Sequence, residues 1–183
     1  MTDKIISDLI QVATEAKAHY QVWWAIEHDG RARFVQALNR FQDFFEATRV
    51  AHFRSMVMAA WKPFDDDSRV SSFKNLIDGN PPFLSASDIA AVQAHLGKQP
   101  LINGLTKIRH LFVAHQNAGL STEQIFTLAN ITPNDLRDLI YQTGDLVNQI
   151  RRKRGWSNGV FESDRGFDST IQLLAALQAA PNL

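Results

Sequence analysis

The stretch that decides the fold is residues 5–24, IISDLIQVATEAKAHYQVWW. Its apolar side chains recur at steps of three and four residues, which is the period of an amphipathic helix. They are Ile5, Ile6, Leu9, Ile10, Val12, Ala13, Ala16, Tyr20, Trp23 and Trp24. The pattern predicts a first helix that runs to about Asp29-Gly30.

The rest of the chain repeats this helical pattern in several segments. A second, long helix is expected from about Phe34 to Trp61, with a wide aromatic face and with Pro63 near its end. Ser85, Ser121 and Thr132 each stand where a helix cap is expected, and a final helix is expected at about residues 168–180. No segment shows the alternation of a strand. The sequence therefore predicts one all-α domain over residues 1–183, a bundle of about five to seven helices.

Composition narrows the class of protein. The 183 residues carry 19 basic and 19 acidic side chains and no cysteine. The balanced charge argues against a large basic surface for duplex nucleic acid, and the absence of cysteine excludes disulfides, thiolate zinc sites and a catalytic thiol. We find no signal peptide or membrane span in the sequence, and we expect a soluble cytoplasmic protein.

One segment, KIRHLFVAHQN at residues 107–117, combines arginine with two histidines. Arginine grips phosphate with a planar fork of donors, and histidine exchanges a proton near neutral pH. In a regular helix, Arg109 and His115 would flank the apolar seam of Leu105, Ile108 and Phe112, about 120° apart. If two copies met along this seam, the arginine of one chain would approach the histidine of the other, so we expect a homodimer. The alternative is structural: a histidine at the edge of a core and an arginine that extends to solvent.

This segment, together with the helical context, resembles the HEPN superfamily (higher eukaryotes and prokaryotes nucleotide-binding) and, most of all, its abortive-infection U-type, or AbiU-like, branch. The residues that carry the resemblance are Arg109, His110 and His115, with Ala114 before the last histidine. The segments YQVWW at 20–24 and WKPFD at 61–65 and the phenylalanine-rich second helix are similar to that branch as well. The resemblance covers a HEPN-like core at about residues 15–155.

The resemblance implies a metal-independent endoribonuclease that acts as a toxin or antiphage effector, with an Arg-x5-His site shared across a homodimer. Arg109 would stabilise charge on the scissile phosphate, His115 would be the general acid or base, and His110 would support the pair. RNA would be the substrate, a cognate antitoxin is a possible partner, and no cofactor is expected. The alternative is a non-catalytic module that binds nucleotide, RNA or a partner protein. Two positions depart from the family pattern: Leu111, where the branch often has a basic residue, and Asn117, where a regulated tyrosine often stands.

Two other charged clusters have alternative interpretations. The run Arg151-Arg152-Lys153-Arg154 could bind RNA phosphates, or it could be a set of cations at the end of a helix that Gly155 closes. Asp65-Asp66-Asp67 could hold a metal, but we expect a turn and helix cap instead. His110 and His115 lie five residues apart, unlike the spacing of four that a helical metal site uses, so no metal site is predicted.

Overall fold

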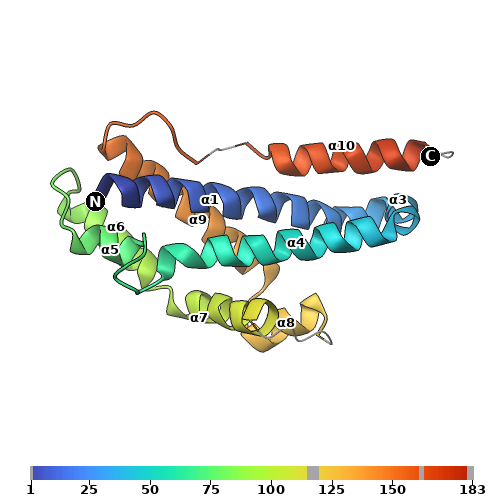
Figure 1. Ribbon diagram of the computed structural model, residues 1–183, viewed down its shortest axis with the longest axis horizontal. Coiled ribbons are helices and arrows are strands. Elements are labelled where there is room, and N and C mark those ends of the chain that lie inside the picture. Colours follow the sequence, from blue (N-terminus) through green and yellow to red (C-terminus); the bar gives the residue numbers. More distant parts are fainter. Residues whose placement is uncertain (1, 115–119, 161–162, 181–183) are drawn as a thin grey trace.

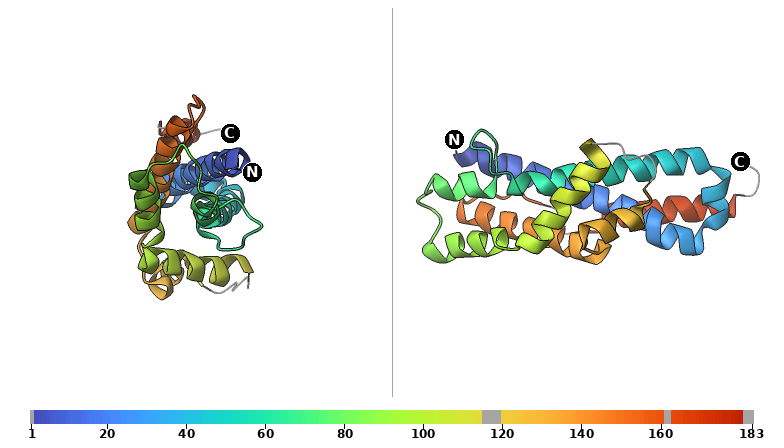
Figure 2. Two further views of the ribbon diagram at one scale, coloured as in Figure 1. Left: turned by 90° about the vertical axis from the view of Figure 1, so that its left-hand side faces the viewer. Right: turned by 90° about the horizontal axis from the view of Figure 1, so that it is seen from below.

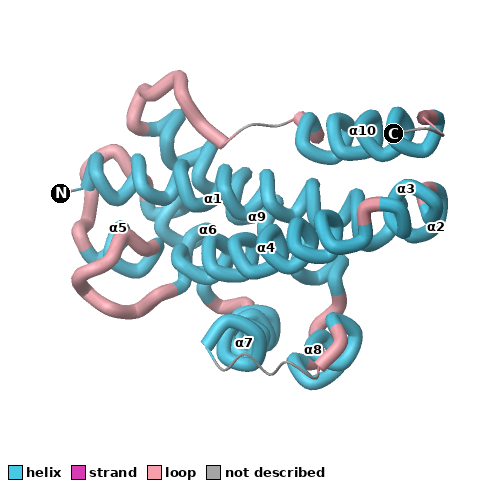
Figure 3. Tube along the Cα trace, turned by 45° about the vertical axis from the view of Figure 1, so that its right-hand side comes forward, coloured by secondary structure: helices cyan, strands magenta, loops and turns pink. Residues whose placement is uncertain are grey.

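The computed structural model describes residues 2–114, 120–160 and 163–180, and every regular element in these ranges is a helix (Figures 1 and 3). The predicted all-α class is therefore confirmed. Two long helices, α1 (Thr2–Trp24) and α4 (Gln42–Trp61), run side by side along the long axis of the molecule. A third long helix, α9 (Pro133–Lys153), packs against α1. These three helices carry most of the core.

The shorter helices surround this frame. Near the N-terminal end of α1 lie α5 (Phe73–Asp78) and α6 (Ala86–Leu96). The pair α7 (Gln99–Ile108) and α8 (Thr122–Ala129) lies on one flank, and α10 (Arg165–Ala179) lies on the opposite flank beside α1 (Figure 2). The helix that carries the motif, α7, is therefore near the edge of the bundle.

Helix starts agree with the caps expected from the sequence. Ser85, Ser121 and Thr132 each accept a hydrogen bond from the backbone N–H three residues later. The side chains of Asp88, Gln124 and Asp135 complete the three capping boxes by accepting from the N–H of the cap residue. Each box satisfies donors that the first turn of a helix leaves open. The final helix begins at Arg165, three residues earlier than expected.

The chain turns at the far end of the bundle, and here it departs from the expected pattern. After α1 it continues as a π-helix, η1 (Ala25–Gly30), and a short helix, α2 (Arg31–Arg33). The expected second helix is then broken at Phe34 and Phe41, with φ of −125° and −117°, so that α3 (Val35–Arg40) is separate from α4. Phe34 is buried in a small core with Phe45 and with Leu174 of α10. The helix α10, which is distant in the sequence, packs against the chain at these breaks.

The acidic run forms a turn but caps no helix. Pro63 lies in a 3₁₀ turn, η2 (Lys62–Phe64), which ends α4 as predicted. The carboxylate of Asp65 then accepts from the N–H of Asp67 at 3.0 Å, and Asp67 binds Arg69. The prediction of a cap is wrong, because the next helix begins only after Ser72, whose hydroxyl is the cap. Short acidic side chains favour local turns as well as caps, and here the turn is what they form.

Three groups of buried side chains hold the bundle together. The largest joins α1, α4, α7, α8 and α9 around the fully buried indole of Trp23. A second fills the end near α5 and α6, and the third is the small core beneath α10. Among the described residues, no helix combines the length and the apolar character that crossing a membrane requires.

Candidate functional site

The apolar seam of the motif helix is buried within the protein itself. Leu105 and Ile108 have no exposed surface and belong to the largest core. Gly104 allows the close approach, because a Cβ there would lie 2.4 Å from a methyl of Ile131 and 3.0 Å from the carbonyl oxygen of Ala129. The predicted dimer interface through Leu105 and Ile108 is therefore wrong: the protein's own α4, α8 and α9 cover that seam. The side chain of Phe112 lies outside the described residues.

The helix changes its hydrogen-bonding pattern where the motif begins. After Ile108 the chain continues as a π-helix, η3 (Arg109–Ala114), whose hydrogen bonds span five residues instead of four. The expected angle between Arg109 and His115 assumed a regular α-helix, so that assumption is wrong for this segment. Single turns of π-helix are frequent at functional sites. His115, the predicted general acid or base, lies outside the described residues.

Arg109 is held by an aromatic ring from another helix. Its guanidinium lies over the indole of Trp61, 3.9 Å from the ring centroid, at the end of α4. Trp61 donates its Nε1–H to the hydroxyl of Thr106 at 3.2 Å, and Thr106 donates to the carbonyl of Ile102 at 2.8 Å. A guanidinium that stacks on an aromatic ring contacts it through its flat face. Its N–H groups point outward in its own plane and can bind other partners.

The donors of Arg109 have no partner among the residues that the structure describes. No ion pair or hydrogen bond joins its guanidinium to any of them, and the side chain is partly exposed. The neighbouring side chains of Lys107 and His110 are exposed. Three residues with basic nitrogens, at the end of α7 and the start of η3, are therefore accessible to an anion from solvent.

The second predicted basic cluster is arranged differently. Arg151 donates to the carbonyl oxygens of Trp156 and Ser157 at 2.7 and 2.9 Å. Lys153 pairs with Asp88 at 3.4 Å, and Arg154 pairs with Asp3 at 2.8 Å. Arg152 is exposed. The structure thus supports the interpretation of this run as cations at a helix end: three of its four members brace the loop after α9 or neighbouring helices.

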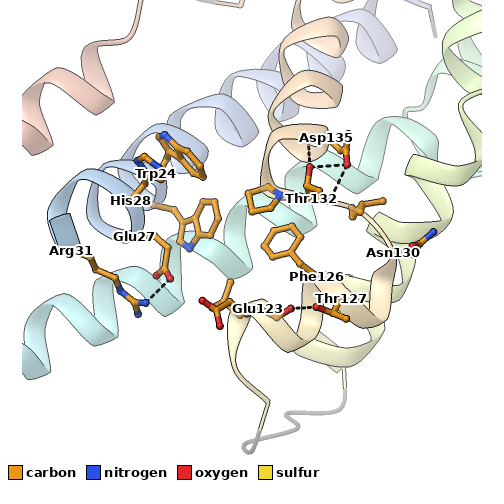
Figure 4. Close-up of a pocket in the computed structure, with 14 residues that line it drawn as sticks. Trp24, Glu27, His28, Arg31, Glu123, Phe126, Thr127, Asn130, Thr132 and Asp135 are labelled. Carbon is orange, nitrogen blue, oxygen red and sulfur yellow. Dashed lines mark hydrogen bonds and ion pairs between the residues drawn. The ribbon is translucent and has the colours of Figure 1, made fainter.

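One pocket in the described part of the chain was not predicted from the sequence. It has a volume of about 750 Å³ and lies between η1 and α8 (Figure 4). Trp24, His28 and Glu27 line one wall, and Glu123 and Phe126 line the other. Indole and imidazole form a stack here, with the ring centroids of Trp24 and His28 4.5 Å apart.

Ion pairs brace this pocket. The carboxylate of Glu27 lies 3.1 Å from both Arg31 and Arg49, and Arg49 also donates to the hydroxyl of Thr122 at 3.0 Å. Arg49 thereby ties η1 to the first residue of α8. Arg49 and Glu27 are only one-sixth exposed, so their attraction is weakly screened by solvent. The shape of the pocket is therefore fixed by charged contacts rather than by packing alone.

The other described histidines have internal partners. His95 is buried between Phe64 and Phe73, and its Nε2 lies 2.9 Å from the hydroxyl of Thr143. Burial lowers the pKa of His95 to about 4. His19 and His52 lie with their Nδ1 atoms 2.9 Å apart, and burial lowers the pKa of both. These residues contribute to packing, whereas His110 faces solvent.

These features define a helical domain of the HEPN type, with its arginine at a π-helical turn on the edge of the bundle. The family model for AbiU2 within that class, HEPN_AbiU2, matches residues 2–164. The chain belongs to this family. No curated protein and no solved structure matches the chain.

Sequence reasoning found Arg109 but missed what holds it. Because Trp61 continues the aromatic face of the expected second helix, its predicted role was packing. No local pattern in the sequence connects Trp61 with Arg109, which lies 48 positions later. The available signal was the position of Trp61 in the segment WKPFD, two residues before the proline that ends the helix. The pocket between η1 and α8 had no such signal, because it depends on the π-helical turn that follows Trp24.

Proposed function

We propose that this AbiU2-family protein is a metal-independent endoribonuclease that acts as a toxin or antiphage effector. The observation that carries the proposal is the guanidinium of Arg109, which is fixed by its face on Trp61 while its N–H donors remain open among the described residues. A preorganised donor that needs no movement during the reaction is what stabilises a developing negative charge. Family membership and the Arg-x5-His spacing supply the rest of the argument.

The chemistry follows from the residue types. The ribose 2′-hydroxyl attacks the adjacent phosphorus, the bond to the 5′-oxygen breaks, and a 2′,3′-cyclic phosphate remains. His115 would take the proton of the 2′-hydroxyl or give one to the leaving oxygen, and Arg109 would bind the phosphate oxygens. His110 would support the pair from the adjacent position. Arg109 supplies the positive charge that a metal ion provides in other nucleases.

A homodimer with a shared site remains part of the proposal, although its interface cannot use the buried side chains of Leu105 and Ile108. The side chains of Lys107 and His110 are exposed, so a second copy or RNA could contact them. A cognate antitoxin would then act by covering this surface. The cytoplasm, where cellular RNA is found, is the compartment that this function requires.

The direct test is cleavage of a defined single-stranded RNA by purified protein in excess EDTA, with end analysis of the products. We expect cleavage and 2′,3′-cyclic phosphate ends. Arg69→Ala is the matched control for Arg109→Ala, because Arg69 is a highly exposed arginine that pairs with Asp67 in its own turn. Cleavage that appears only after magnesium or manganese is added would contradict the mechanism.

The pocket between η1 and α8 favours a second candidate function, a non-catalytic module that binds nucleotide, RNA or a partner protein. Its aromatic walls and its size suit a planar ligand or an aromatic side chain. Glu123→Ala and His28→Ala, both on exposed positions of the lining, would weaken such binding. If the protein binds an oligonucleotide or a mononucleotide through these residues and never cleaves RNA, this second function is the correct one.

A further inference from the structure

We infer that Trp61 is a positioning residue for Arg109, and that Thr106 fixes Trp61 in that role. The inference rests on the proposed function and names the part of the site that sets the direction of the arginine. Trp61 does not touch the reacting atoms. Its ring lies 3.9 Å from the guanidinium carbon of Arg109 and restricts that side chain, whose N–H groups can then bind a phosphate of RNA.

The arrangement is a closed loop of contacts between two helices. Trp61 ends α4, whereas Thr106 and Arg109 belong to α7 and to the first position of η3. The indole is hydrogen-bonded by its edge to Thr106 and covered on its face by Arg109, three residues further along the same helix. Because both contacts come from one helix, the ring and the guanidinium keep a fixed relation even if α7 moves slightly against α4.

The hydroxyl of Thr106 has a defined orientation as well. It donates to the carbonyl of Ile102 at 2.8 Å, one helical turn back, so its oxygen presents a lone pair to the Nε1–H of Trp61. A hydroxyl can donate one hydrogen bond and accept another at the same time. The chain of donors therefore runs from Trp61 through Thr106 to the backbone of α7.

Comparison with a core tryptophan separates this role from simple packing. Trp23 has no exposed surface and is surrounded by Phe53, Phe126 and Trp24. Trp61 is partly exposed and borders a hollow of about 410 Å³ between α1 and α4. A residue that only filled the core would not need an indole at this edge, where a leucine or methionine could cover the same apolar neighbours.

Without the ring of Trp61, Arg109 would keep its ability to bind phosphate but would lose its fixed orientation. An arginine side chain that is released from its ring samples many rotamers, and misplacement of a catalytic group by about 1 Å can cost 10²-fold in rate. Removal of the ring should therefore reduce kcat by about 10- to 100-fold while KM changes little. Removal of Arg109 itself should cost more, about 10²–10³-fold.

The test compares Trp61→Phe, Trp61→Leu, Thr106→Val and Arg109→Ala in the full-length protein. Cleavage of one RNA is measured for kcat and KM, and binding of a 2′-O-methyl oligonucleotide, which cannot be cleaved, is measured in parallel. NMR of the arginine Nε–Hε groups provides an independent readout, because an indole ring shifts the Hε resonance of a stacked arginine. Thr106→Val keeps the shape of the side chain but removes the hydroxyl. It therefore still tests the inference if Trp61→Leu does not fold.

We expect Trp61→Phe to keep kcat within a few-fold of wild type and to retain a ring-shifted Arg109 resonance. Trp61→Leu should lose both, and Thr106→Val should lower kcat several-fold. If Trp61→Leu and Thr106→Val cleave as fast as wild type while Arg109→Ala is inactive, the inference is wrong and the proposed function stands. If wild type does not cleave and Arg109→Ala binds the oligonucleotide as well as wild type does, the proposed function fails and the inference fails with it. If wild type binds through Arg109 without cleaving, the proposed function fails and the Arg109 resonance decides the inference. Loss of the ring shift in Trp61→Leu supports the positioning role, and a wild-type resonance without a ring shift contradicts it.

Discussion

Two arginines in this protein, Arg109 and Arg151, show how the same side chain is used for opposite purposes. Arg151 donates hydrogen bonds within the molecule, to the carbonyl oxygens of Trp156 and Ser157. Among the described residues, Arg109 is held only by the contact of its guanidinium with the indole of Trp61. Satisfied donors stabilise a loop, whereas donors held in place without a partner are available to a ligand. In the sequence, both belong to clusters of basic residues and could not be distinguished in this way.

The largest effect should come from His115, the proposed partner of Arg109 in catalysis. We predict that His115→Ala reduces RNA cleavage by about 10²–10⁴-fold, because a positioned acid or base contributes a factor of that size. Mixing inactive His115→Ala with inactive Arg109→Ala should restore part of the activity if the site is shared between two chains, since a heterodimer can contain one intact pair. Cleavage by each variant and by the mixture, at equal total protein, checks this. A mixture as inactive as its components would contradict a shared site.

A buried histidine with an internal partner should behave like Arg151 and affect stability alone. The pKa of His95 is about 4 in the folded protein because of burial, compared with about 6.5 in the unfolded chain. As the pH falls from 6.5 to 4, the unfolded chain binds a proton that the folded protein does not, so the folded state loses stability. The loss attributable to His95 is about 3 kcal/mol, and it is complete near pH 4.

Unfolding by urea across this pH range measures the effect. His95→Gln can still bond to Thr143 but does not titrate, so its free energy of unfolding should fall less steeply between pH 6.5 and 4. His19 and His52, whose pKa values are also lowered, contribute to the slope that remains in this variant. An unchanged slope in His95→Gln would show that His95 is not the group responsible.

The brace around Arg151 can be disturbed without touching the arginine. A Cβ at Gly159 would lie 2.3 Å from Nε of Arg151 and 2.4 Å from Oδ1 of Asn148, which holds the backbone of Val160. Gly159→Ala should therefore destabilise the protein by about 1–3 kcal/mol, because buried hydrogen bonds are displaced. Thermal unfolding detects this as a lower midpoint, and cleavage per folded molecule should be unchanged. Gly155→Asn, at a left-handed residue with nothing within 4 Å of a Cβ, is the control and should cost less.

The smallest effect is expected at the exposed member of the basic run. Arg152→Ala should leave both the midpoint of thermal unfolding and the cleavage rate at 0.15 M salt near the wild-type values, because no described residue pairs with its side chain. RNA binding at several salt concentrations sharpens this prediction. If Arg152→Ala reduces the salt dependence of binding by about one phosphate contact, the basic run contributes to the RNA surface after all.

Local signals predicted much of this fold. The capping boxes at Ser85 and Thr132 and the end of α4 near Pro63 depend on residues a few positions apart, so the sequence contains all the information that they need. The breaks at Phe34 and Phe41 lie where α10, more than 120 residues later in the sequence, packs against the chain, and local signals do not contain that contact. The acidic run at residues 65–67 failed as a cap because carboxylates serve turns equally well, and the sequence does not show which will form.

The sequence proposes residues for the candidate site but does not give their arrangement. Arg109 and His110 were found from their types and spacing, and the seam of Leu105 and Ile108 was recognised as apolar. The partner of that seam was misjudged, because a helical pattern cannot say whether its own chain or a second copy covers it. The switch to a π-helix at Arg109 and the contact with Trp61 depend on how α7 packs against α4.

The most direct test of the contrast between the two arginines is a crossed measurement on Arg109→Ala and Arg151→Ala. Each variant is assayed for RNA cleavage in EDTA and for its thermal unfolding midpoint, on the same preparation. We expect Arg109→Ala to lose at least about 10²-fold in cleavage with an unchanged midpoint. Arg151→Ala should cleave normally per folded molecule but lose about 2 kcal/mol, equivalent to roughly 4–8 °C in a chain of this size. If Arg109→Ala unfolds at a much lower temperature and cleaves as wild type does, Arg109 is a structural residue and the central claim is wrong.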